Sequence, residues 1–233
     1  IAQIMAVGGM RVLMFDVENS AAKDGCAFAA RMISRAVEKG NMASEKADLA
    51  VGQLEVVVAL RDLATCDVVI EAVLEDLEIK RAVFNELEGI VREDCILATN
   101  TSSLSVTAIG VDLNLPNRLA GFHFFNPVPL MKVVEVVEGL ETAPKVIQTL
   151  CAVARRAGHE PVQVKDTPGF LVNHAGRGLN TEGVRIVSEG IADFAGIDDL
   201  LREGGPGFRM VWAASTRTSL GKWRMGLLYR VMC

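Results

Sequence analysis

Apolar and polar positions alternate with two different periods along the chain, and these periods predict the order of strands and helices. Short apolar runs rich in Val and Ile predict buried strands, whereas apolar residues three and four positions apart predict amphipathic helices. The predicted strands cover residues 10–15, 54–59, 66–73, 96–99, 119–124, 131–137 and 161–164. The predicted helices cover residues 20–39, 44–52, 77–91, 104–109 and 142–158. Residues 1–9 have the pattern of a helix that ends on glycine.

Helices between successive strands are typical of an α/β fold, so we expect a Rossmann-like, doubly wound and mostly parallel sheet. After the last predicted strand, Thr167 suits a helix N-cap and Pro168 the first position of a helix. The sequence therefore predicts a Rossmann-like domain over residues 1–165 and a second domain, beginning with a helix, over residues 166–233.

Composition narrows the class of protein. Half of the 233 residues are hydrophobic, which is enough for a sizeable core. No apolar run reaches the roughly 18 residues of a membrane helix, and the first residues lack the pattern of a signal peptide, so we expect a cytoplasmic protein without a membrane partner. The five cysteines are odd in number and form no CxxC pair, which argues against a disulfide framework or a metal site and favours reduced thiols.

Charge argues against a nucleic-acid partner, because the net charge is −5 and phosphate binding needs clustered cations. The charge is unevenly distributed. Residues 211–233 hold four basic side chains and no acidic one, whereas residues 1–210 hold 20 basic and 29 acidic side chains. Both tryptophans and the only tyrosine also lie in this atypical tail, 211–233.

One histidine and one glutamate are candidates for chemistry. A lone histidine among phenylalanines, such as His123, is more often a hydrogen-bonded core residue than a catalyst. Glu135, however, interrupts a β-branched run that should be buried, where a carboxylate is costly unless a donor meets it. A contact between the two side chains would satisfy both groups and would form a general acid–base pair.

Three blocks of the sequence resemble the signature blocks of the 3-hydroxyacyl-CoA dehydrogenases. They are residues 100–104 (NTSSL), residues 123–127 (HFFNP) with Glu135, and residues 166–173 (DTPGFLVN). The resemblance extends from residue 1 to about residue 210. It implies reversible oxidation of an L-3-hydroxyacyl-CoA to the 3-ketoacyl-CoA, with NAD as cofactor, His123 as the catalytic base and Glu135 as the group that orients it.

The same resemblance assigns the binding residues. The substrate-binding residues would be Ser102 and Asn173. The NAD-binding residues would be Asp16, Glu75, Lys80, Asn100, Ser102 and Asn126. Several of these residues have a plainer interpretation: Asp16 could be a strand-end acid or a helix N-cap, Glu75 and Lys80 the solvated start of a helix, and the polar residues after residue 99 a turn with Ser103 as N-cap. An acid at residue 16 favours NAD over NADP, since it repels a 2′-phosphate.

The resemblance also implies an all-α C-terminal domain that forms a homodimer interface, which we expect to be incomplete here. A GxGxxG turn belongs about 20 residues before the ribose-binding acid, but only 15 residues precede Asp16. We therefore expect the glycine-rich loop to be missing from the N-terminal end. The resemblance ends after Met210, and a frameshift or an amphipathic terminal helix would explain the tail.

Three alternatives remain. The chain could be an inactive nucleotide-binding fragment, or a domain cut from a multifunctional β-oxidation protein. It could also be a 3-hydroxyacid dehydrogenase acting on a free acid, although such enzymes use a lysine in place of the pair His123 and Glu135. Residues 173–178 and 207–210 are similar to the bacterial branch of the family used in phenylacetate breakdown.

Overall fold

The computed structural model describes residues 1–203 and 231–232. The chain divides into two compact units. The first contains Ile1–Pro168 together with the strand at residues 231–232, and the second begins at Gly169. The predicted tail, 211–233, lies outside the described residues except for that strand.

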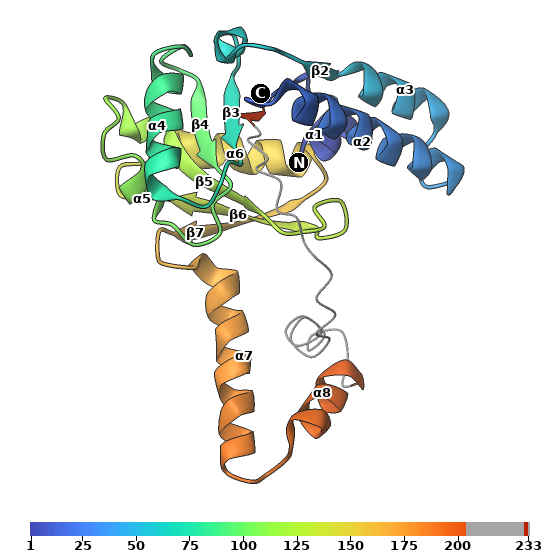
Figure 1. Ribbon diagram of the computed structural model, residues 1–233, viewed down its shortest axis with the longest axis vertical. Coiled ribbons are helices and arrows are strands. Elements are labelled where there is room, and N and C mark those ends of the chain that lie inside the picture. The colour runs from blue at the N-terminus through green and yellow to red at the C-terminus, as the bar shows by residue number, and fades with distance from the viewer. Residues whose placement is uncertain (204–230, 233) are drawn as a thin grey trace. The chain divides into compact units, whose positions relative to one another are not determined.

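The first unit is built on one eight-stranded sheet with the strand order β2-β1-β8-β3-β4-β5-β6-β7 (Figure 1). Its strands are β1 (Val12–Phe15), β2 (Leu54–Val56), β3 (Val68–Glu71), β4 (Ile96–Thr99), β5 (Leu119–Phe124), β6 (Val133–Glu138), β7 (Glu160–Lys165) and β8 (Val231–Met232). Neighbouring strands are parallel except for β5 with β6 and for β8 with both of its neighbours. The prediction of a mostly parallel α/β sheet is therefore confirmed.

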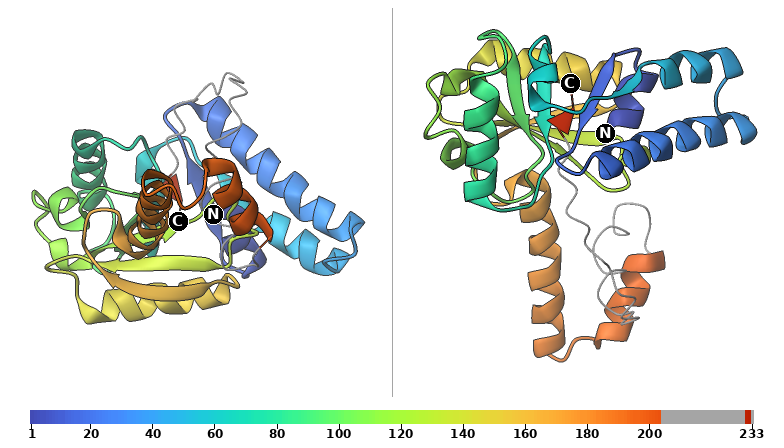
Figure 2. Two further views of the ribbon diagram at one scale, coloured as in Figure 1. Left: turned by 90° about the horizontal axis from the view of Figure 1, so that it is seen from below. Right: turned by 45° about the horizontal axis from the view of Figure 1, so that its top comes forward.

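Helices cover both faces of this sheet. They are α1 (Ala2–Val7), α2 (Asn19–Glu38), α3 (Ser44–Gly52), α4 (Leu77–Glu88), α5 (Val106–Ile109) and α6 (Pro144–Arg156), with short 3-10 helices at Leu60–Leu63 and Pro116–Arg118. Figure 2 shows α6 on one face of the sheet and α4 on the other. The central strands β4 and β5 are thus shielded from water on both sides, whereas the outer strands β2 and β7 keep exposed residues.

The main core lies between the sheet and the helices α1 and α6. Phe122 and Val136 of the sheet, Leu150 of α6 and Ile4 of α1 belong to one buried cluster. Burial of each such side chain contributes about 1.5–3 kcal/mol. Gly121 lets β5 and β6 approach closely, because a Cβ on this residue would lie 2.6 Å from the Cβ of Val137.

The second unit contains α7 (Phe170–Ser188) and α8 (Phe194–Glu203). The prediction that Thr167 caps the first of these helices, with Pro168 as its first residue, is wrong. The helix begins at Phe170, and Gly169 is the N-cap with a φ of 81°. This left-handed conformation favours glycine, so the turn between the units is specified by Gly169 rather than by Thr167.

The cysteines differ in state. Cys26, Cys95 and Cys151 are free thiols, but Cys66 is disulfide-bonded, so the expectation that all thiols are reduced is wrong at Cys66. Burial raises the pKa of the Cys95 thiol to about 11, which makes it inert at neutral pH.

Within residues 1–203 and 231–232, we find no helix with the length and apolar character needed to cross a bilayer.

Candidate functional site

The candidate residues of the first unit gather at one edge of the sheet. Strands β1, β3, β4 and β5 run in one direction, so their carboxyl ends share this edge, and antiparallel β6 begins there. Ligands of open α/β sheets bind at such an edge. The candidates that lie at or just beyond it are Asp16, Glu75, Asn100, Ser102, His123 and Glu135.

His123 and Glu135 form a buried pair across the antiparallel strands β5 and β6. They are direct partners in the strand register, and His123 Nδ1 lies 2.8 Å from Glu135 Oε2. His123 is only 6% exposed and Glu135 is fully buried. Because a carboxylate only accepts hydrogen bonds, it holds the proton of the neutral imidazole on Nδ1 and leaves the lone pair on Nε2. The expected contact is therefore present, and the catalytic role of the pair stays a prediction.

Asn100 connects the ends of three strands next to this pair. Its backbone N–H donates to the Glu71 carbonyl at 2.8 Å, and its side-chain Oδ1 accepts from the Phe124 N–H at 2.9 Å. The amide thus fixes the end of β5 immediately beyond His123. This contact accounts for Asn100 without a ligand, so its predicted contact with NAD stays a prediction.

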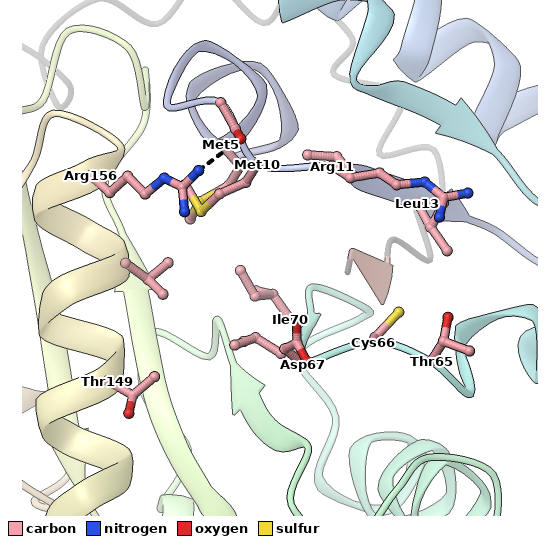
Figure 3. Close-up of a pocket in the computed structure, with 14 residues that line it drawn as sticks. Met5, Met10, Arg11, Leu13, Thr65, Cys66, Asp67, Ile70, Thr149 and Arg156 are labelled. Atoms are coloured by element: carbon pink, nitrogen blue, oxygen red, sulfur yellow. Dashed lines mark hydrogen bonds between the residues drawn. The ribbon is translucent and has the colours of Figure 1, made fainter.

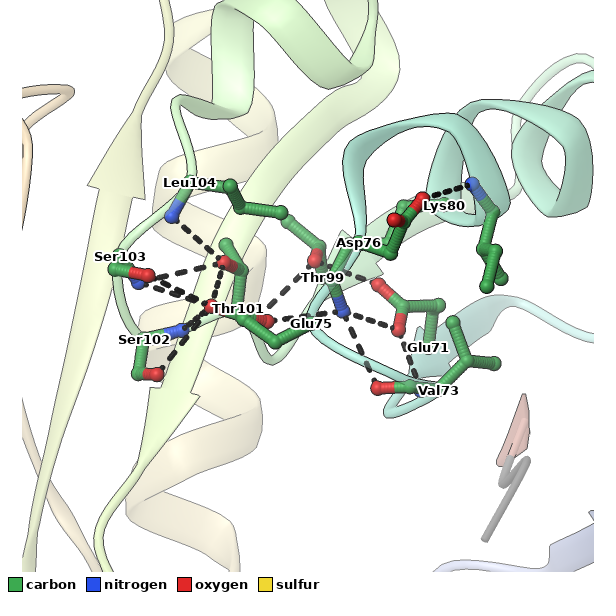
Figure 4. A network of polar contacts seen from close by, with 11 residues as sticks. Glu71, Val73, Glu75, Asp76, Lys80, Thr99, Thr101, Ser102, Ser103 and Leu104 are labelled. Atoms are coloured by element: carbon green, nitrogen blue, oxygen red, sulfur yellow. Dashed lines mark hydrogen bonds and ion pairs between the residues drawn. The ribbon is translucent and has the colours of Figure 1, made fainter. Parts of the chain in front are cut away.

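Glu75 organises the loop that follows β4 (Figure 4). Its Oε1 accepts from Thr101 Oγ1 at 2.6 Å, from the Ser102 N–H at 2.9 Å and from the Ser103 N–H at 3.1 Å. Burial alone would raise the pKa of the Glu75 carboxyl, but these hydrogen bonds and the charge of Lys80 hold the pKa below its ordinary value. Glu75 is therefore held ionised at neutral pH.

The N-cap predicted at Ser103 is wrong. The cap of α5 is Ser105, whose Oγ accepts from the Ala108 N–H at 3.1 Å. Ser103 Oγ instead donates to Glu75 at 3.1 Å. A carboxylate from a distant part of the chain thus holds the loop that carries Ser102.

Lys80 lies in the interior rather than at the solvated start of a helix. It is 1% exposed, and its Nζ lies 2.7 Å from Glu71 Oε1 and 3.4 Å from Glu75 Oε2. Its ammonium therefore faces two carboxylates of the protein, and its predicted contact with NAD stays a prediction. Glu71, which the sequence interpretation missed, interrupts an apolar strand in the same way as Glu135, and this signal could have identified it.

Asp16 follows β1 at the same edge of the sheet. It is 3% exposed, and its Oδ1 accepts from the Glu18 N–H at 2.9 Å. The N-cap of α2 is Glu18, so the interpretation of Asp16 as the N-cap is wrong. A carboxylate at this position of a Rossmann-like sheet fits the ribose hydroxyls of a dinucleotide, and the residues present thus suit NAD.

Two further candidates remain, Asn126 and Asn173. Asn126 is exposed, precedes a cis peptide bond with Pro127 and lines a cavity of about 540 Å³ beside α2. Asn173 lies on α7 in the second unit, where its carbonyl accepts from Arg177 Nε at 3.2 Å. Their roles toward cofactor and substrate stay predictions.

A second cavity, of about 480 Å³, separates β1 from β3 (Figure 3). Arg11 and Leu13 on one side face Asp67 and Ile70 on the other. β8 pairs only with the last residues of the two flanking strands, and the cavity reaches their first residues. It therefore extends toward the amino ends of the strands, away from the edge that carries His123.

No group of three or more potential metal ligands occurs in the part of the chain that the structure describes. The candidate site consists of acids, amides, hydroxyls, the ammonium of Lys80 and one imidazole.

The fold and this edge of the sheet define a Rossmann-like, nucleotide-binding α/β protein. The family model described as "3-hydroxyacyl-CoA dehydrogenase, NAD binding domain" matches residues 1–167. The chain belongs to this family, which confirms the resemblance seen in the sequence and NAD as the cofactor of the family.

Several known proteins align with most of this chain. A 3-hydroxyadipyl-CoA dehydrogenase of Escherichia coli is 42% identical over 213 residues, which cover 90% of this chain and 44% of the relative. The fatty acid oxidation complex subunit alpha of Psychrobacter arcticus is 37% identical, over 88% of this chain and 28% of the relative. The chain thus spans less than half the length of these curated relatives.

A similar solved structure is that of (S)-3-hydroxybutyryl-CoA dehydrogenase from Ralstonia eutropha. It superposes with a TM-score of 0.81 at 34% identity, over 87% of this chain and 72% of that chain. The 3-hydroxybutyryl-CoA dehydrogenase of Escherichia coli superposes with a TM-score of 0.79 at 38% identity, over 82% of this chain and 40% of that chain.

Proposed function

We propose that the protein to which this chain belongs oxidises L-3-hydroxyacyl-CoA to 3-ketoacyl-CoA reversibly, with NAD. The observation that carries the proposal is the buried pair of His123 and Glu135, with 2.8 Å between Nδ1 and Oε2, at the ligand edge of an NAD-binding fold. The relatives named for acyl-CoA dehydrogenation support the substrate class.

The pair would move the proton of the reaction. His123 accepts the proton of the 3-hydroxyl group at Nε2, because Glu135 keeps the other ring nitrogen protonated. The carboxylate of Glu135 then stabilises the imidazolium that forms. NAD, when bound, supplies the acceptor for the hydride that leaves the same carbon.

The other assigned residues would bind and orient. Asp16 accepts hydrogen bonds from the adenosine ribose and disfavours a 2′-phosphate, which makes NAD the cofactor rather than NADP. Ser102 and Asn173 hold substrate oxygens, and Asn126 positions the nicotinamide side. Glu75 and Lys80 complete the NAD site through the loop that they hold.

The cavity beside α2 supports a CoA ester as substrate. It is lined by the apolar side chains of Phe28 and Met32 and by the cations Arg35 and Lys39. An apolar wall with cations suits a ligand that combines an alkyl chain with phosphates. The pathway would be β-oxidation of fatty or aromatic acids, including phenylacetate breakdown, in a cytoplasmic homodimer formed through the C-terminal helical domain.

The test is NADH oxidation with acetoacetyl-CoA, followed by absorbance, in the wild type and in His123→Ala. Positioned proton transfer contributes about 10² to 10⁴ in rate, so we expect His123→Ala to lose this factor in turnover and to keep its NADH affinity. His174→Ala is the matched control, since His174 is an exposed histidine on α7. Full turnover in His123→Ala would refute the assignment.

A second candidate is a dinucleotide-binding domain without turnover. NADH fluorescence that changes on binding, with no oxidation by acetoacetyl-CoA, would identify this second function.

A further inference from the structure

We propose that Glu71 is a positioning residue, which holds the loop after β4, and with it Ser102, in the geometry that the dehydrogenase reaction needs. This inference rests on the proposed function, in which Ser102 contacts the substrate. Glu71 itself is fully buried, so it acts through its contacts inside the protein and not as a catalytic residue. Its role is exerted through two chains of contacts that end on the same loop (Figure 4).

Glu71 is a buried carboxylate with all its contacts inside the protein. It is fully buried at the end of β3. Its Oε1 accepts from the Val73 N–H at 2.6 Å and from Lys80 Nζ at 2.7 Å, and its Oε2 accepts from Thr99 Oγ1 at 2.7 Å. A buried carboxylate is tolerated only with such partners, so these contacts fix its position.

The first chain of contacts passes through Lys80. Its ammonium is held by Glu71 and lies 3.4 Å from Glu75 Oε2. The opposite oxygen of Glu75 accepts from the N–H groups of Ser102 and Ser103, at 2.9 and 3.1 Å. Lys80 is 1% exposed whereas the Glu75 side chain is 37% exposed, so the buried Lys80 anchors the solvent-facing Glu75.

The second chain of contacts passes through β4. Thr99 Oγ1 donates to Glu71 and accepts from the Thr101 N–H at 3.2 Å. Thr101 Oγ1 in turn donates to Glu75 at 2.6 Å and accepts from the Leu104 N–H at 3.0 Å. Both chains of contacts therefore end on the loop after β4. Removal of the Glu71 charge releases Lys80 and frees Glu75 to move, which displaces Ser102.

The primary variant is Glu71→Gln, which keeps the volume of the side chain and retains Lys80. We expect amide hydrogen exchange of Ser102 and Ser103, measured by NMR, to accelerate by about tenfold or more, while the amide of Phe122 in β5 stays protected. We expect kcat with acetoacetyl-CoA, per active site counted by NADH titration, to fall about 10- to 100-fold, since small displacements of positioning groups cost factors of this size.

The matched control is Glu88→Gln. Glu88 is a glutamate of α4 that also accepts from loop amides, those of Asn114 and Leu115, at 2.8 and 2.9 Å. We expect this variant to accelerate the amide exchange of Asn114 and Leu115. The amide exchange of Ser102 and the kcat per active site should stay unchanged. A general loss of stability would move both variants alike.

Three more variants keep the test decisive if Glu71→Gln does not fold. Glu71→Gln with Lys80→Met replaces the buried ion pair by neutral groups of similar volume, which proteins often tolerate. Thr99→Val removes the hydroxyl and so breaks the second chain of contacts. Thr99→Ser, which keeps the hydroxyl, should have wild-type amide exchange and kcat.

Unchanged exchange at Ser102 and Ser103 in the folded Glu71 variant would overturn the proposal, as would faster exchange with an unchanged kcat. If the wild type has no turnover, the proposed function fails, and the exchange measurement alone then decides whether Glu71 holds the loop.

Discussion

Replacement of Glu135 by glutamine tests the acid–base pair with the least change in shape. The variant keeps the volume of the side chain and removes its charge at a position that is fully buried and 2.8 Å from His123 Nδ1. A hydrogen bond to a charged group contributes about 1.5–3 kcal/mol. If this stabilisation acts on the imidazolium formed in the transition state, its loss lowers kcat by roughly 10- to 150-fold.

A glutamine amide can also donate to Nδ1 and so move the proton of the neutral imidazole to Nε2. That reversal would remove the base itself, and in Ser-His-Asp triads the corresponding change lowers kcat by about 10⁴. A loss well above 150-fold would therefore indicate the wrong tautomer rather than the lost charge alone.

The assay is NADH oxidation at saturating acetoacetyl-CoA, with circular dichroism to verify folding. Glu138→Gln on the same strand is the control, since the Glu138 side chain is 37% exposed and its ion pair with Lys165, at 2.7 Å, lies at the surface. Surface ion pairs contribute about 0–1 kcal/mol, so this variant should keep its kcat. Glu135→Gln with the kcat of the wild type would refute the reasoning.

Two further predictions concern stability. Gly121→Ala places a Cβ 2.6 Å from the Cβ of Val137. We expect this clash to lower the free energy of unfolding, measured with urea, by about 1–3 kcal/mol. An unchanged urea midpoint would mean that β5 and β6 move apart without cost. The pKa of Glu75 is lowered in the folded protein, so its stabilising effect is present above its unfolded pKa of about 4.3 and is lost as pH falls through the lower, folded value. Urea midpoints of the wild type and Glu75→Gln should accordingly differ at pH 7 and converge in acid, and a difference that grows in acid would contradict the sign.

The sequence predicted the strands best where apolar runs are continuous. Residues 96–99 and 119–124 form strands with the expected bounds, and every residue in them is buried, as in strands covered on both faces. The pairing of His123 and Glu135 was predictable for a related reason: an acid inside a buried run signals a partner. The same signal at Glu71 shows that an interruption in any buried strand is informative.

Long-range contacts account for what the sequence did not predict. Several neighbouring serines can cap a helix, and the selection of Ser105 depends on Glu75, which lies in another loop and holds Ser103. The start of α7 depends on the backbone conformation of Gly169 rather than on the propensities of Thr167 and Pro168. The burial of Lys80 likewise follows from tertiary packing, because local sequence made it a surface residue.

The antiparallel pairing of β5 and β6 places both members of the proposed acid–base pair on one hairpin. His123 and Glu135 are 12 positions apart in the sequence, so a short loop closure suffices to bring them together, at small entropic cost. Both members of the proposed acid–base pair therefore belong to one hairpin, whereas Asp16, Glu75 and Asn100 belong to the loops after three other strands.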